Sequence, residues 1–280
     1  MQEGSIVDRC LLCIDTPDFL FMPEHAFLLR SPAGRQHLVS LSLPSSAPPP
    51  EGGWPTAYVL DTPQFQQAVR MLRQQGDLPG VVVGVGYAQE DSRELDYTPA
   101  DEPGRAAQFL SFLQHDLMAE LRRHAGVPLD ERRQTLCGHS LGALLGLYAL
   151  RQQAPAFSAY VLSSPSVWWG EDRPAYRWAA EVAGQRPWRG AHSVWLSVGE
   201  FEQGLSPQEH ERPADYQALQ LARRRERRMV DGAHELAGVL AGQAGLNVHF
   251  RVLAGCSHGN AGQQSIAAGW RAVLVKPAAA

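Results

Sequence analysis

The segment at residues 137–142, Cys-Gly-His-Ser-Leu-Gly, constrains the fold more than any other part of this 280-residue chain. Its serine, Ser140, has a glycine two positions away on each side, at Gly138 and Gly142. Residues 133–137 read as a short buried strand, and the apolar, small-residue run at 141–150 reads as a buried helix. Glycines at this spacing let a strand and a helix pack too closely for side chains. The pattern therefore predicts a strand, a strained turn and a helix, with the Ser140 hydroxyl held clear of the backbone at the helix N-terminus.

Strands and helices alternate along most of the remaining chain. An antiparallel hairpin is expected first, with arms at 27–31 and 37–44 and a turn at 32–34. The order of strands and helices then predicts an α/β fold built on a mostly parallel central sheet with helices on both faces. We expect a single domain, residues 1–280, with a core at about 27–275. Residues 89–104 are expected to be irregular, 170–189 partly helical and 203–213 a flexible loop. The expected strands are 56–60, 80–87, 133–137, 157–164, 192–198 and 246–253, and the expected helices are 64–75, 106–123, 141–150, 215–240 and 263–275.

Two helices carry informative patterns. In the helix at 64–75 an apolar stripe recurs at helical spacing and predicts a buried face. In the helix at 215–240 the charged run at 223–228 is interpreted as a solvated face. The stripe consists of Phe65, Ala68, Val69 and Leu72.

Composition narrows the function classes. The net charge of −4 gives no reason to expect a nucleic acid or an anionic membrane as partner. No apolar run approaches the ~20 residues of a membrane-spanning helix. The start of the chain lacks the pattern of a secretory leader, so the cytoplasm is expected, or the periplasm if a leader has been removed. Cys10 and Cys13 have C-x-x-C spacing without a second pair, so we expect buried side chains and neither a metal site nor a disulfide framework.

A nucleophilic serine needs a base, and His258 is the strongest candidate. It follows the last expected strand in the small-residue loop Ser257-His258-Gly259, at the edge of the sheet where Ser140 is also expected. The acid that would orient the imidazole is expected after the strand at 192–198, with Glu202 first and Glu200 second. A Ser–His dyad without an acid stays open as an alternative. No cofactor is required for this chemistry.

Acyl transfer also needs two N–H groups to bind an oxyanion. One is expected from Leu141, directly after the serine. The second is expected near the end of the strand at 56–60, and because Pro63 has no N–H, it falls to Thr62 or Gln64.

Several segments together resemble a known family. They are Gly-His-Ser-Leu-Gly at 138–142, Ser-Pro-Ser-Val-Trp-Trp at 164–169, Val-Gly-Glu at 198–200 and Ser-His-Gly at 257–259. These are similar to the esterase branch of the α/β-hydrolases. The strand end at Gly86-Tyr87 and Asp-Tyr-Thr-Pro at 96–99 resemble the enterobactin/salmochelin-type siderophore esterases. The resemblance covers about residues 27–270.

The resemblance implies an α/β-hydrolase fold and hydrolysis of the ester bonds of a ferric catecholate tri-lactone, with iron belonging to the substrate. It implies Ser140 as nucleophile and His258 as base, with a variable third member. It suggests Arg93 and Tyr87 for substrate binding, and Trp168 and Trp169 against the aromatic groups, although core packing is an equal alternative for one tryptophan. Asp-Thr-Pro at 61–63 replaces the usual Asp-Gly, and the loop at 90–95 is short. The alternatives are a general carboxylesterase or S-formylglutathione hydrolase-like thioesterase, and a non-catalytic binding module.

Overall fold

The computed structural model describes residues 25–45, 48–88, 92–99, 105–184 and 192–274. Its contacts divide the chain into two compact units, Met1–Asp130 and Glu131–Ala280, and both combine strands with helices. Cys10 and Cys13 lie outside the described residues. Within the described ranges, no helix has the length and apolar character needed to cross a membrane. The prediction of one domain over the whole chain stays a prediction.

The first unit contains the predicted N-terminal hairpin. Its strands are β1 (His25–Arg30), β2 (Gln36–Ser42), β3 (Trp54–Leu60) and β4 (Val81–Tyr87), in the order β1-β2-β4-β3. β2 runs antiparallel to both β1 and β4, whereas β3 and β4 are parallel. The antiparallel hairpin followed by parallel pairing confirms this part of the predicted fold.

Helices cover both faces of these strands. On one face α1 (Thr62–Gln74) packs so closely that a Cβ on Gly84 would lie 2.5 Å from the ring of Phe65. On the other face the ring of His37 stacks on Phe112 at 4.7 Å. The predicted apolar stripe of α1 is fully buried. A short helix, α2 (Arg93–Tyr97), interrupts the segment predicted to be irregular, and the helix predicted at 106–123 comprises α3 (Arg105–Ser111), a π-helical turn η1 (Phe112–Leu117) and α4 (Met118–His124).

The second unit is built on four parallel strands. They are β5 (Leu129–His139), which starts just before the boundary between the units, β6 (Ala159–Ser163), β7 (His192–Gly199) and β8 (Leu246–Leu253), and they are neighbours in that order. Because the carboxyl ends of parallel strands meet at one edge of a sheet, the residues after β5, β6, β7 and β8 are brought together there.

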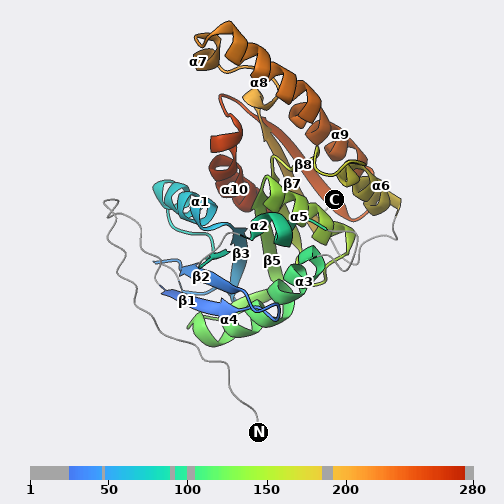
Figure 1. Ribbon diagram of the computed structural model, residues 1–280. Helices are drawn as coiled ribbons and strands as arrows, with labels where there is room; N and C mark the ends of the chain where they lie inside the picture. Colours follow the sequence, from blue (N-terminus) through green and yellow to red (C-terminus); the bar gives the residue numbers. More distant parts are fainter. Residues whose placement is uncertain (1–24, 46–47, 89–91, 100–104, 185–191, 275–280) are drawn as a thin grey trace. The chain divides into compact units, whose positions relative to one another are not determined.

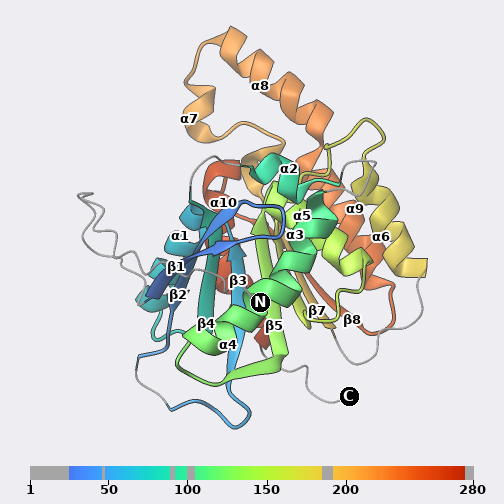
Figure 2. The same ribbon diagram turned by 60° about the horizontal axis from the view of Figure 1, so that its bottom comes forward.

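Helices cover both faces in this unit as well. A Cβ on Gly146 of α5 (Leu141–Arg151) would meet Leu162, and one on Gly269 of α10 (His258–Leu274) would meet Val161. Val161 and Leu162 are successive residues of β6 and point to opposite faces, so α5 and α10 pack on opposite sides. Figure 2 shows α5, α6 (Pro174–Gly184) and α9 (Met229–Ala241) side by side. Parallel strands between two helical layers confirm the predicted fold class.

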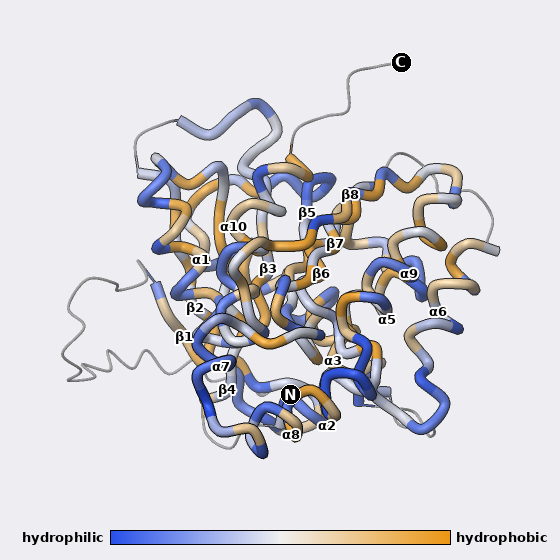
Figure 3. Tube along the Cα trace, turned by 90° about the horizontal axis from the view of Figure 1, so that it is seen from above, coloured by the Kyte–Doolittle hydropathy of each residue, from blue (hydrophilic) through white to orange (hydrophobic). Residues whose placement is uncertain are grey.

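One predicted helix is wrong in its extent. The helix expected at 215–240 is two helices, α8 (Ala214–Arg227) and α9, separated at Arg228, whose backbone is left-handed with φ 51°. The loop expected at 203–213 contains α7 (Pro207–His210). No side chain of α7 or α8 is buried, and Figure 1 shows both helices, in orange, extending away from the strands of this unit. Figure 3 shows long hydrophilic stretches along α8. We call residues 203–227 the α7–α8 arm.

Candidate active site

Ser140 occupies the sharp turn between β5 and α5. Its backbone has φ 59° and ψ −118°, outside the regions that a residue with a side chain normally adopts. The N–H of Ser140 donates to the carbonyl of Ser163 at 3.0 Å, and its own carbonyl accepts from Leu144 at 3.1 Å, which starts α5. A Cβ on Gly138 would lie 2.3 Å from the carbonyl group of Gly142. The strand, strained turn and helix are therefore present as predicted, and the close approach explains the glycines.

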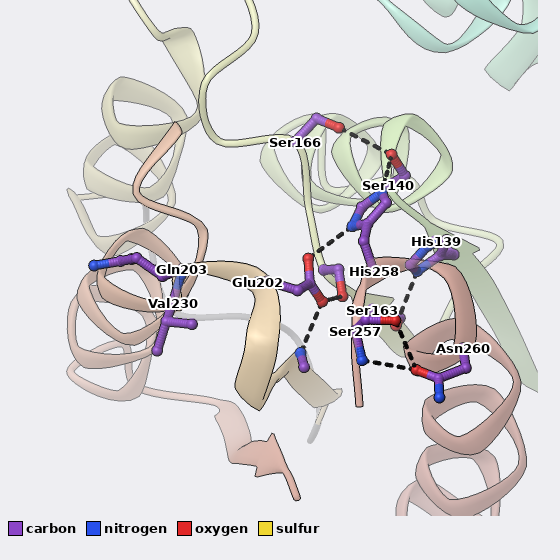
Figure 4. Close-up of polar contacts among 12 residues, drawn as sticks. His139, Ser140, Ser163, Ser166, Glu202, Gln203, Val230, Ser257, His258 and Asn260 are labelled. Carbon is purple, nitrogen blue, oxygen red and sulfur yellow. Dashed lines mark hydrogen bonds and ion pairs between the residues drawn. The ribbon is translucent and has the colours of Figure 1, made fainter. Parts of the chain in front are cut away.

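His258 is the first residue of α10 and lies over the serine. The loop before it is held by Asn260, whose Oδ1 accepts from the N–H of Ser257 at 2.8 Å. His258 Nε2 lies 3.0 Å from Ser140 Oγ, as Figure 4 shows. The ring of His139 packs 4.6 Å from the ring of His258 and hydrogen bonds through Nδ1 to Ser163 Oγ at 3.2 Å. His139 therefore packs against the imidazole of His258.

Glu202 completes a line of three side chains. Its Oε2 lies 2.7 Å from Nδ1 of His258. The Glu202 side chain is 1% exposed, whereas that of His258 is 45% exposed, so the acid is buried behind an accessible base. The other oxygen, Oε1, accepts from the N–H of Gly199 at 2.7 Å and from the hydroxyl of Ser164 at 2.5 Å. Both oxygens of this buried carboxylate are thus hydrogen bonded, as burial requires.

These contacts fix the protonation pattern. Burial on its own would raise the pKa of Glu202, but the hydrogen bond and charge of His258, with the Ser164 and Gly199 donors, hold that pKa below its ordinary value. Glu202 is then a carboxylate and can only accept, so in the neutral imidazole Nδ1 of His258 carries the proton and Nε2 presents a lone pair. The hydroxyl of Ser140 must donate to that lone pair. The hydroxyl of Ser166, 3.3 Å from Ser140 Oγ, donates to the nucleophile in turn.

Glu200, the second candidate for the acid, has a different partner. Its Oε2 accepts from the N–H of Gly255 at 2.8 Å, in the loop that precedes His258. One residue on, the N–H of Phe201 donates to the carbonyl of Cys256 at 2.9 Å. Glu200 therefore joins two loops, and of the two candidates it is Glu202 that contacts the imidazole.

The predicted oxyanion donors lie in different units. Leu141 is the first residue of α5, so its N–H is among those that have no carbonyl partner within the helix. In the first unit, Thr62 is the first residue of α1 and follows Asp61, whose φ is 73°. The side chain of Thr62 occupies the space beside Gly86. Both assignments stay predictions.

The two predicted tryptophans are half-buried and lie directly after the segment that contacts the nucleophile. The N–H of Trp169 donates to the carbonyl of Ser166 at 3.0 Å. The ring of Trp168 lies under the guanidinium of Arg227, 4.4 Å from its carbon. Their role in substrate binding stays a prediction.

The other two predicted substrate contacts belong to the first unit, where both are paired with carboxylates. Arg93 forms an ion pair with Asp61 at 3.0 Å. The hydroxyl of Tyr87 donates to Asp96 at 3.0 Å, and Asp96 also pairs with Arg35 at 2.5 Å. The charge of Arg93 is therefore balanced within its own unit, and its predicted role is untested.

Sequence reasoning missed three hydroxyls around Ser140, His258 and Glu202, namely those of Ser163, Ser164 and Ser166. All three are fully buried at the carboxyl end of β6. The signal that could have found them is the density of hydroxyls in Ser-Ser-Pro-Ser at 163–166. Hydroxyls directly after a buried strand have to find polar partners, and here His139, Glu202 and Ser140 are those partners.

Comparisons with known proteins point to one class of enzyme. A family model described as "Putative esterase" matches residues 31–239. The chain is 30% identical over 196 residues to the ferri-bacillibactin esterase BesA of Bacillus subtilis, covering 60% of this chain and 67% of that protein. It is 30% identical over 180 residues to the siderophore triacetylfusarinine C esterase of Aspergillus fumigatus, covering 58% of this chain and 59% of that protein.

A solved structure extends the similarity over more of the chain. The siderophore hydrolase EstB from Aspergillus nidulans superposes with a TM-score of 0.76, covering 92% of this chain and 97% of that one at 24% identity. At this level of identity the similarity concerns the fold, and it agrees with the α/β class described above.

Proposed function

Because this chain belongs to the esterase family, we propose that it is a serine hydrolase that cleaves the ester bonds of a catecholate siderophore lactone. Family membership and the named relatives confirm the prediction of an ester-hydrolysing enzyme. The observation that carries the mechanism is the line from Ser140 to His258 at 3.0 Å and from His258 to Glu202 at 2.7 Å. The siderophore substrate is supported by what the relatives are named for.

The proposed reaction runs through an acyl-enzyme. Nε2 of His258 takes the proton of Ser140 as Oγ attacks the ester carbonyl. The resulting oxyanion is bound by the N–H of Leu141, with Thr62 as the proposed second donor. The tetrahedral intermediate collapses, and the imidazolium returns its proton to the leaving alcohol. Water, activated by the same imidazole, then releases the acid from Ser140.

Glu202 acts on the base and not on the substrate. Its carboxylate accepts from Nδ1 of His258, holds the tautomer that leaves Nε2 free, and stabilises the imidazolium that forms during attack. Ser164 and Gly199 keep the carboxylate in place. The exposed imidazole above a buried acid suits a base that must meet a large substrate.

The partner in this proposal is the small-molecule ester itself, with iron as its cargo. A cytoplasmic location, or a periplasmic one after removal of a leader, stays a prediction that fractionation of the native host tests. The chain also fits a general carboxylesterase or a thioesterase, so the substrate panel below includes their esters.

The test uses purified protein and the Ser140→Ala variant. We expect the wild type to hydrolyse a ferric catecholate tri-lactone faster than S-formylglutathione or a 4-nitrophenyl ester, with products identified by mass. Ser140→Ala should lower turnover at least about a thousandfold, because the nucleophile is gone while the binding surface remains. Preferred turnover of S-formylglutathione would contradict the siderophore substrate, and unchanged turnover in Ser140→Ala would contradict the mechanism.

A further inference from the structure

The helices of the α7–α8 arm make polar contacts with the rest of the second unit. None of the side chains of its helices is buried. Arg224 of α8 pairs with Glu209 of α7 at 2.6 and 2.9 Å and also donates to the carbonyl of Gly204. The Arg224–Glu209 pair therefore holds α7 and α8 together within the arm.

The base of the arm contacts Trp168 and Arg173, in the segment that follows Ser166. Arg173 donates to the carbonyl of Glu226 at 2.9 Å. The guanidinium of Arg227 lies 4.4 Å from the centre of the Trp168 ring. Trp168 is two residues after Ser166, and two residues of extended chain span at most about 7 Å. Since Ser166 Oγ is 3.3 Å from Ser140 Oγ, the backbone that carries Trp168 continues directly from the catalytic centre to the Arg227–Trp168 pair.

Arg227 differs from the arginines beside it. Arg224 has Glu209 as a partner, and Arg228 has Glu235 at 2.6 Å. Across the described ranges, Arg227 has no carboxylate partner, and its side chain is exposed. A guanidinium stacked on an aromatic face keeps the N–H groups along its edge available for planar pairs of oxygens.

We propose that Arg227, held over the Trp168 ring, recognises anionic oxygens of the substrate at the rim of the Ser140 site. The class of ligand is an ester that carries a planar pair of anionic oxygens, as a catecholate or a carboxylate does. The inference rests on the proposed function and adds a residue that sets charge preference. Arg227 binds and does not take part in the chemistry at Ser140.

The first experiment compares a neutral and an anionic ester, 4-nitrophenyl acetate and 4-nitrophenyl hemisuccinate. We expect Arg227→Gln to lower the ratio of kcat/KM for the anionic ester to that for the neutral ester about fivefold, as for an exposed ion pair. The loss should be in KM and should shrink as salt is added. Arg227→Lys, which keeps the charge without the planar fork, should lower the ratio less.

Arg225→Gln is the matched control, because Arg225 lies in the same exposed run but two residues away, on another side of α8. It should leave the ratio unchanged. An equal effect of Arg225→Gln and Arg227→Gln, or no effect of either, would overturn the proposal, since the charge preference would then be a property of the whole run or of another surface.

A binding measurement keeps the inference separate from the proposed hydrolysis. In the Ser140→Ala background, quenching of tryptophan fluorescence reports binding of a ferric tris-catecholate complex without turnover. We expect Arg227→Gln to weaken this binding about fivefold. If the wild type hydrolyses neither ester, the proposed function fails while this titration still decides on Arg227. Equal affinity with and without Arg227 would refute the inference even if hydrolysis is confirmed.

Discussion

The catalytic centre and the α7–α8 arm belong to the same unit, and the arm follows directly after Glu202 along the chain, yet the two regions are held in opposite ways. Around Ser140 the backbone itself is fixed, because the approach of Gly138 to Gly142 leaves no room for a Cβ. The carboxylate of Glu202 is buried and fully hydrogen bonded. In the arm no helical side chain is buried, and the Arg224–Glu209 pair joins its two helices to each other.

The difference teaches which substitutions each region can accept. A centre fixed by steric contact and burial should lose function or stability when one atom is added or removed. An arm fixed by partly exposed ion pairs should tolerate changes at small cost to the free energy of unfolding. The following experiments test this contrast, from the largest expected effect to the smallest.

The largest effect after loss of the nucleophile is expected at Glu202. Glu202→Ala should lower kcat about a hundred- to ten-thousandfold, because the imidazole loses the acceptor that fixes its tautomer. A measurable remainder should persist, since Ser140 and His258 are still in contact. Glu200→Ala, measured in the same assay, is the control and should cost far less. A loss equal to that of Ser140→Ala would show that the acid is indispensable, and no loss would favour a dyad.

Gly138→Ala should destabilise the protein, because the added Cβ would meet backbone atoms of Gly142 at 2.3 Å. Overpacking of this kind costs about 1–3 kcal/mol or more. Gly204→Ala in the arm is the matched control, since its Cβ would have no atom within 4 Å. Urea unfolding of both variants measures the difference. Equal stability of the two variants would contradict steric fixation of the turn.

A smaller effect is expected when the ion pair that joins α7 and α8 is removed. Arg224→Gln removes the ion pair with Glu209 and should lower the free energy of unfolding by less than about 1 kcal/mol. Amide hydrogen exchange should speed up in α7 and α8 while exchange in α5 stays as in the wild type. Faster exchange in α5 as well would mean that the arm and the catalytic centre are coupled.

The smallest effect is expected when pH changes the contribution of Glu209 to the stability of the α7–α8 arm. The hydrogen bond from Arg224 lowers the pKa of Glu209 from 4.5 to about 2, since it outweighs the opposing effect of burial. A carboxyl whose pKa is lower in the folded state stabilises it above its unfolded pKa, so the contribution of Glu209 is full above pH 4.5 and is lost as pH falls towards 2. NMR signals of α8 should therefore move over this range in the wild type and not in Glu209→Gln. The same shift in both proteins would assign it to another group.

The order of the chain was enough to predict Ser140 and His258 as partners. Residues after successive parallel strands meet at one edge, so the contact over 118 positions follows from topology. The choice between Glu202 and Glu200 could not be made the same way. It depends on a single 3₁₀ turn, η2 (Glu200–Glu202), which directs one side chain back to Gly199 and His258 and the other to Gly255.

The break between α8 and α9 could not be predicted from the sequence either. Arg228 adopts a left-handed conformation without being glycine or asparagine, and the surrounding arginines favour a continuous helix. Arg228 pairs with Asp231 and Glu235 of the next helix, at spacings that a continuous helix would also bring together. These ion pairs therefore do not mark the break in the sequence.

The loop that carries the acid and the loop that carries the base are joined to each other. Gly255 donates to Glu200, and Phe201 donates to the carbonyl of Cys256, one residue before the turn that leads to His258. The arm begins directly after Glu202, but neither of these two bonds involves a residue of the arm. The acid loop and the base loop are therefore tied together by their own residues.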